Sequence, residues 1–129
     1  MNEGAFSLDV PAEPLNLGTA RTFASRVAVH FGCPDDTVLD LKLAVSEACT
    51  GWIADAQGDE RAVRVFVRPD IDHLRVEVTG SGQIGAAATE LEGGGPTRLE
   101  LIRSLFPDAE IAPSGDGGVA VRFSVPTRG

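Results

Sequence analysis

Residues 35–56 read DDTVLDLKLAVSEACTGWIADA, and this stretch decides the fold. Its apolar residues recur at steps of three and four, which is the spacing of one face of an amphipathic helix. That apolar stripe consists of Val38, Leu41, Val45, Ala48 and Trp52. Asp35 and Asp36 follow Pro34 and are candidate caps for the start of the helix. The pattern predicts a helix that runs to about Ala56 and buries its apolar stripe.

The residues before this helix predict one strand and one further helix. Apolar and polar residues alternate from Phe6 to Val10, which indicates a strand with one buried face. Pro11 interrupts the alternation, as is typical of an edge strand. Apolar residues recur at helical spacing between Gly18 and Phe31, and Gly32 with Pro34 ends that segment.

The residues after it predict a hairpin, a short helix and two last strands. Alternation over 63–68 and 74–78 predicts two strands joined by a turn at 69–72. The segment TRLELIRSLF, residues 97–106, predicts a helix that ends before Pro107. Strands are expected near 109–112 and 119–125. Between 80 and 96 lies a segment with six glycines, a length typical of a lid-like functional loop or of a disordered segment.

This order of elements predicts an α+β, two-layer sandwich: a mixed, mostly antiparallel sheet with helices packed on one face. The chain of 129 residues, 43% of them apolar, is in the range of a single domain spanning 1–129. A domain of this size builds a core without disulfides or metals. That core should be aliphatic, because the chain has six Phe, one Trp and no Tyr.

Charge and cysteine content narrow the classes of function. The net charge of −8 argues against direct nucleic-acid binding, which needs a basic surface; it suits a basic protein partner or plain solubility. We expect a cytoplasmic protein without membrane contact, because no signal-peptide pattern or span-length apolar run occurs. Cys33 and Cys49 have no metal-ligand spacing and His30 and His73 lie far apart, so we expect no metal site. Buried, reduced thiols are expected, with a redox pair as the alternative.

Three segments, in their order and spacing, resemble the anti-sigma serine kinases of the GHKL ATPase superfamily. The segments are LKLAVSEACTGWIADA at 41–56, LRVEVTGSGQ at 74–83 and GGGPTRLELIRSL at 93–105. Residues 6–28, FSLDVPAEPLNLGTARTFASRVA, are also similar to the first strand and helix of that family. The resemblance covers nearly the whole chain, and it implies the Bergerat or GHKL ATPase-like version of the sandwich.

The resemblance implies a nucleotide site whose first motif is half retained. In the family, the second helix carries a Glu that acts as a base and, four residues later, an Asn that holds magnesium. Glu47 and Gly51 match this pair. Residues four apart share a helix face, so both side chains would reach one triphosphate. Glu47 is therefore the catalytic candidate if kinase activity is retained, whereas Gly51 has no side chain to hold a metal.

The other two motifs are altered further. The family's Asp-x-Gly-x-Gly run aligns with residues 80–84, where Gly82 is retained, Gly80 replaces the Asp that binds adenine, and Ile84 replaces the second glycine. The phosphate-cradling turn aligns with residues 94–99, where Pro96 lacks an amide donor and Arg98 replaces a small residue. The resemblance thus places a degenerate nucleotide site at Gly51, Gly80, Gly82, Thr97 and Arg98.

These losses favour a protein without ATP or magnesium. Losing a hydrogen bond to a carboxylate costs about 1.5–3 kcal/mol, and a disrupted metal contact costs about 10- to 100-fold. Two such defects would move a micromolar site to about millimolar affinity. ATP binding stays open because Arg98 could hold phosphate oxygens through two hydrogen bonds. Plainer interpretations are a solvated carboxylate for Glu47, outer-face charges for Arg98 and Arg103, and a linker at 93–95.

The function implied by the resemblance is that of a bacterial anti-sigma factor with weak or lost kinase activity. Such a protein binds an alternative sigma factor and releases it when a STAS-domain anti-anti-sigma factor competes; a homodimer is a further expectation. The alternatives are an active serine kinase that phosphorylates the STAS partner, with Glu47 as base, and a regulator whose altered pocket binds another nucleotide. In the family, dimer and sigma contacts use the first strand and the helix-rich face.

Overall fold

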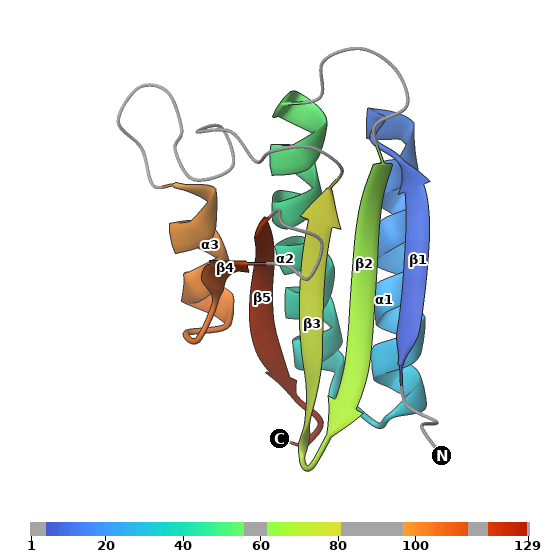
Figure 1. Ribbon diagram of the computed structural model, residues 1–129. Helices are drawn as coiled ribbons and strands as arrows, with labels where there is room; N and C mark the ends of the chain where they lie inside the picture. Colours follow the sequence, from blue (N-terminus) through green and yellow to red (C-terminus); the bar gives the residue numbers. More distant parts are fainter. Residues whose placement is uncertain (1–4, 56–61, 81–96, 114–118, 129) are drawn as a thin grey trace.

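The computed structural model describes residues 5–55, 62–80, 97–113 and 119–128 (Figure 1). Predicted features at 81–96 and 114–118, and the end of the second helix at Ala56, lie outside these ranges, as does the Trp52 side chain. The elements follow in the order β1 (Phe6–Pro11), 3-10 helix η1 (Pro14–Asn16), α1 (Leu17–His30), α2 (Asp35–Asp55), β2 (Ala62–Asp70), β3 (His73–Gly80), α3 (Arg98–Leu105), β4 (Glu110–Pro113) and β5 (Val119–Pro126).

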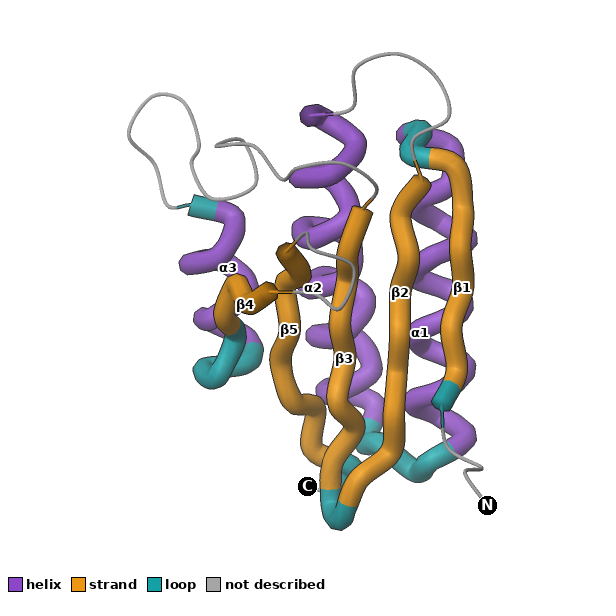
Figure 2. The backbone as a smooth tube through the Cα atoms, in the orientation of Figure 1, coloured by secondary structure: helices purple, strands orange, loops and turns teal. Residues whose placement is uncertain are grey.

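The strands form one sheet in the order β1-β2-β3-β5-β4, with α1 and α2 side by side behind it (Figures 1 and 2). Each of the four described strand pairs is antiparallel, so the sheet is more regular than the mixed sheet expected. β1 is an edge strand, as the interruption at Pro11 predicts. The predicted α+β sandwich with helices on one face is confirmed.

The core lies between the sheet and the helices and is aliphatic, as predicted. In the hairpin, Val65 lies opposite Val78 and Val67 opposite Val76, and all four are fully buried. Alternate residues of a strand share one face, so these valines all point toward the helices. From α2, the buried stripe that meets them contains Leu41, Ala44, Val45 and Ala48.

Two local features differ from the sequence prediction. β2 runs to Asp70 and β3 starts at His73, so the hairpin turn contains two residues rather than the four expected at 69–72. Asp72 has φ of 64°, a left-handed conformation that Asp tolerates better than most residues. Asp70 Oδ1 accepts a hydrogen bond from the Ile71 amide at 2.8 Å, which stabilises the tight turn. The 3-10 helix η1 was not predicted.

The two cysteines are free and buried, as expected. Cys49 is only 2% exposed. Burial raises the pKa of the Cys49 thiol from 9.0 to about 12, because the thiolate loses its hydration. Below the pKa of the unfolded chain the neutral thiol is present in both states, so the thiol starts to destabilise the fold only above about pH 9. Stability is then lost progressively as the pH rises from 9 toward 12.

We expect Cys49 to resist Ellman's reagent in the folded protein. The raised pKa lowers its thiolate fraction near pH 8 by about a thousandfold. The measurement compares native and urea-unfolded protein in a Cys33→Ala background, so that only Cys49 contributes. Equal labelling rates before and after unfolding would contradict the burial of this thiol.

Candidate functional site

Three elements bring the predicted nucleotide-site residues to one end of the molecule. The carboxyl-terminal half of α2, the carboxyl end of β3 and the amino end of α3 all lie toward the upper end in Figure 1. α2 carries Glu47 and Gly51, and β3 ends at Gly80. α3 begins at Arg98, after its cap residue Thr97. The fold therefore gathers residues that are far apart in the sequence.

Glu47 and Arg98 form an ion pair that joins α2 to α3. Arg98 Nη1 donates a hydrogen bond to Glu47 Oε1 at 3.2 Å, and the two side chains are 18% (Arg98) and 36% (Glu47) exposed. The plainer interpretations, a solvated carboxylate and an outer-face charge, omit this contact: the two side chains pair with each other while Glu47 stays 36% exposed. A partly exposed pair contributes at most about 1 kcal/mol. The pair matters for the chemistry of the site, because the Arg98 guanidinium binds Glu47 of this chain and not an added phosphate.

The amino end of α3 is closed by a capping box. Thr97 Oγ1 accepts a hydrogen bond from the Glu100 amide at 2.9 Å, and the Thr97 amide donates to Glu100 Oε1 at 2.9 Å. A helix amino end attracts anions through its free amides and its dipole. Here a carboxylate of the helix itself occupies that position. The Thr-x-x-Glu pattern of residues 97–100 is the sequence signature that could have revealed this arrangement.

Packing at its carboxyl end fixes α3 in place. Ile102 is 1% exposed, and the Phe106 ring stacks on Phe123 of β5 with centroids 5.0 Å apart and planes at 17°. Arg103 Nε donates to the Ala109 carbonyl at 2.7 Å, so Arg103 is a structural donor rather than a free surface charge. Because α3 is anchored in this way, Arg98 is held toward Glu47.

The remaining predicted residues supply no side-chain groups to the site. Gly51 is buried one turn beyond Glu47 on α2, and Gly80 is the last residue of β3, opposite Val63. Neither glycine has a side-chain amide to hold magnesium or a side-chain carboxylate to bind adenine, so this part of the site does not fit magnesium-ATP. Gly82 lies outside the described residues, as do Ile84 and Pro96. In the part of the chain that the structure describes, no cluster of three His, Cys, Asp or Glu residues could hold a metal.

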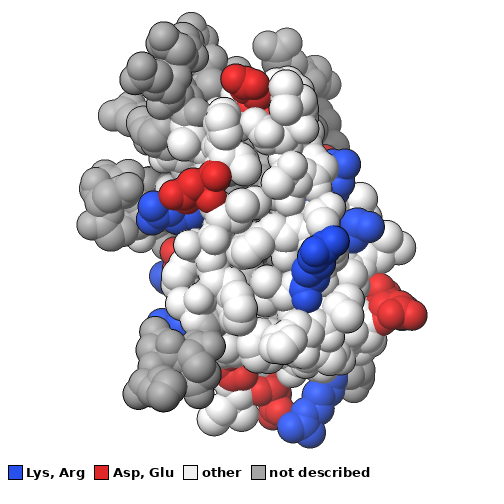
Figure 3. Space-filling view, turned by 90° about the vertical axis from the view of Figure 1, so that its right-hand side faces the viewer, with Lys and Arg blue, Asp and Glu red and all other residues white. Residues whose placement is uncertain are grey.

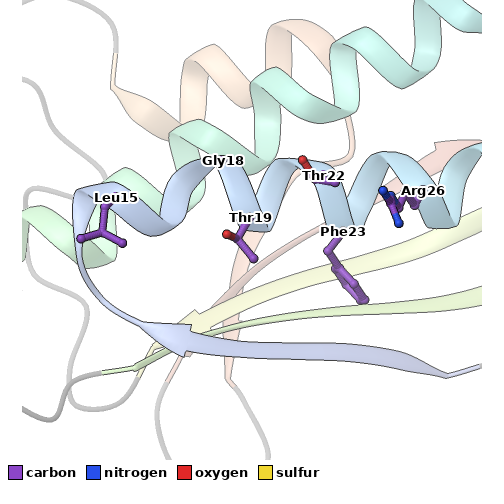
Figure 4. A pocket seen from close by; sticks show the side chains of 6 residues that line it. All are labelled: Leu15, Gly18, Thr19, Thr22, Phe23 and Arg26. Atoms are coloured by element: carbon purple, nitrogen blue, oxygen red, sulfur yellow. The ribbon is translucent and has the colours of Figure 1, made fainter.

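A groove of about 570 Å³ lies on the outer side of α1, away from the site above. Figure 4 shows the side chains of Leu15, Thr19 and Phe23 on the side of α1 toward β1, with Thr22 and Arg26 projecting elsewhere around the helix. Leu15 is 78% exposed. The residues that line the groove are Leu15, Gly18, Thr19, Thr22, Phe23 and Arg26. Phe23 belongs to the apolar helical pattern between Gly18 and Phe31 and packs against the core while partly buried, but the sequence did not indicate the groove.

Further apolar side chains are exposed on the helix layer. Val29 on α1 is 63% exposed, and Leu39 and Leu43 on α2 are 59% and 52% exposed. Figure 3 faces the side of the molecule formed by β1 and α1, where uncharged residues cover most of the described surface. Exposed apolar surface on one layer of a protein is typical of a region that binds another protein.

The sandwich, with an acidic residue on α2 facing the start of α3, defines a domain of the histidine-kinase ATPase class. A family model for the histidine kinase-like ATPase domain matches residues 10–125, and the chain belongs to this family. It is 37% identical to the serine-protein kinase RsbW of Bacillus pumilus, over 96% of this chain and 88% of that protein.

Two further RsbW serine-protein kinases match shorter stretches of the chain. Identity is 41% over 76 residues with the Bacillus velezensis protein and 36% over 77 residues with the Bacillus subtilis protein. These alignments cover 59% and 60% of this chain, and 48% of each relative. The chain therefore spans about half the length of these two relatives. Separately, within the described ranges, no helix is long and apolar enough to cross a membrane.

Proposed function

We propose that this protein is a cytoplasmic anti-sigma factor that acts by binding rather than by phosphoryl transfer. It sequesters an alternative sigma factor. A STAS-domain anti-anti-sigma factor competes for the same surface of this protein and so releases the sigma factor. The proposal rests on membership of the family and on the resemblance to anti-sigma kinases.

The choice of binding over catalysis rests on the missing side chains at Gly51 and Gly80 and on the ion pair between Glu47 and Arg98. A general base must reach the proton that it removes with a free carboxylate oxygen. Arg98 Nη1 holds Oε1 of Glu47 at 3.2 Å, so a catalytic Glu47 would have to use Oε2, and Glu100 caps the helix end where phosphate would bind. Both anion-handling positions of the described site are thus engaged within the chain.

The groove beside α1 is the part of the surface that we assign to a protein partner. Leu15 and Phe23 give the groove an apolar part, and together with the exposed Arg26 they suit an amphipathic helix with an acidic edge. The exposed apolar side chains of Val29, Leu39 and Leu43 extend the same layer of helices. A partner helix would bury these groups and would leave the opposite face of the sheet free.

An active serine kinase is the second candidate function. Two observations favour it: Glu47 stands at the position of the base, and the relatives are serine-protein kinases. Incubation with labelled ATP, magnesium and candidate STAS proteins separates the two functions. We expect no transfer. Transfer that disappears in a Glu47→Gln variant would establish the kinase instead.

The binding proposal is tested by calorimetry of the full chain with candidate sigma factors and STAS proteins. We expect one sigma factor to bind, and a STAS protein to release it when added in excess. If no candidate of either class binds, the proposal is wrong.

We expect a Leu15→Asp substitution to weaken sigma binding about tenfold, because a charge would enter the apolar wall of the groove; this corresponds to about 1.4 kcal/mol. Ile71→Asp is the matched control, since Ile71 is 82% exposed but lies in the hairpin turn. It should bind like the unmodified protein. Equal effects of the two substitutions would show that the groove is not the contact.

A further inference from the structure

The face of the sheet that points away from the helices carries a row of charged side chains. In the described part of the chain, no helix covers this face (Figure 1). Two of its arginines have carboxylate partners: Arg64 Nε lies 2.7 Å from Asp9 Oδ1, and Arg122 Nε lies 2.8 Å from Glu110 Oε2. The Arg64 hydrogen bond lowers the pKa of Asp9. These pairs show that the face is neutralised locally at both ends.

Nearer the turn between β2 and β3, two arginines face each other without partners among the described residues. The strand register places Arg68 of β2 directly opposite Arg75 of β3. Among the described residues, neither makes a side-chain hydrogen bond or an ion pair. Glu77 lies on the same face, but opposite Phe66 and Arg122, and it forms no described ion pair. Like charges directly opposite on a sheet destabilise it. The two guanidinium groups therefore repel each other, and an anion bound between them would relieve this repulsion.

An aromatic side chain adjoins the two arginines. Phe66 precedes Arg68 by two residues, so both lie on the same face, and Phe66 is only partly buried there. Arginine and aromatic residues are the types most enriched where proteins bind each other. We call Phe66, Arg68 and Arg75 the arginine patch.

We propose that the arginine patch binds an acidic segment of a partner protein. One carboxylate of that segment sits between the two guanidinium groups, which bind carboxylates through paired hydrogen bonds. A neighbouring apolar side chain of the segment covers Phe66. A nucleic acid fits less well, because its backbone presents a run of phosphates that needs a wider basic surface than two arginines. This surface is separate from the groove at α1, and its assignment does not depend on the anti-sigma function.

The test uses nitrogen-15 NMR of the full chain with the capped peptide Glu-Glu-Leu-Glu-Glu as the probe. We expect saturable shifts of the Arg68 and Arg75 Nε–H signals and of the Phe66 amide, which weaken as salt is added. The matched peptide Lys-Lys-Leu-Lys-Lys should leave these signals unchanged. If no shifts occur at about 10 mM peptide, the Kd is too weak to matter and the proposal is overturned.

Substitutions then locate the site. Replacing both Arg68 and Arg75 by Gln should weaken peptide binding at least tenfold. Replacing both by Lys should weaken it less, because Lys keeps the positive charge but lacks the planar guanidinium group that binds a carboxylate through two hydrogen bonds. Arg64→Gln is the control on the same strand and face and should bind like the unmodified protein. Equal loss in the control, tighter binding of an oligo-dT strand, or shifts that depend only on protein concentration, as in self-association, would each overturn the proposal.

Discussion

Replacement of Leu41 by Ala is expected to lower the free energy of unfolding by about 3 kcal/mol. Leu41 is fully buried on the face of α2 that meets the valines of the sheet. Removing its side-chain carbons leaves a cavity in a close-packed interior, and Leu→Ala changes at such sites cost about 2.7–5 kcal/mol. A domain of this kind has only about 5–15 kcal/mol of stability, so urea denaturation should detect a large fall in the midpoint.

Leu43→Ala provides the control on the same helix. Leu43 is 52% exposed, so the same chemical change removes little buried surface. Alanine also has the highest helix propensity, and we expect a change within about 0.5 kcal/mol. A similar loss in both variants would mean that α2 does not orient its residues as described.

The fold could be predicted because its pattern repeats along the chain. Steps of three and four predicted α2, with Leu41, Val45 and Ala48 buried, and strict alternation predicted the valines of β2 and β3 as core. Such patterns depend only on the period of each element. Boundaries were less certain, because the residues at helix ends are set by hydrogen bonds: α3 begins at Arg98 since the Thr97 side chain caps it.

The sites depend on tertiary contacts that periodicity does not contain. Nothing local to Glu47 indicates that Arg98, 51 residues later, lies 3.2 Å from it. The arginine patch depends on the turn. A four-residue turn at 69–72 would set Arg68 opposite His73, whereas the two-residue turn sets it opposite Arg75. The family resemblance assigned positions to a nucleotide site, but it did not predict that two of them, Glu47 and Arg98, bind each other.

The nucleotide site should regain affinity for magnesium-ATP when its missing groups are restored. We expect the unmodified chain to bind magnesium-ATP no more tightly than about 1 mM, because Gly51 and Gly80 have no groups for metal or adenine. Gly51→Asn with Gly80→Asp restores an amide to the face of α2 that carries Glu47 and a carboxylate to the end of β3. Those two contacts together correspond to about 3–5 kcal/mol, or more than a hundredfold in affinity.

The measurement is calorimetry, with the fluorescence of Trp52, the sole Trp, as a second readout. Each restored variant is first compared with the unmodified chain by circular dichroism, because Gly51 is buried and a larger residue must be accommodated there. Adding Arg98→Ala removes the partner of Glu47, and only this triple variant should transfer phosphate to a STAS protein. Glu47→Gln in the same background should abolish that transfer. Micromolar binding of magnesium-ATP by the unmodified chain would show instead that groups other than these hold the nucleotide, and that the ion pair does not close the site.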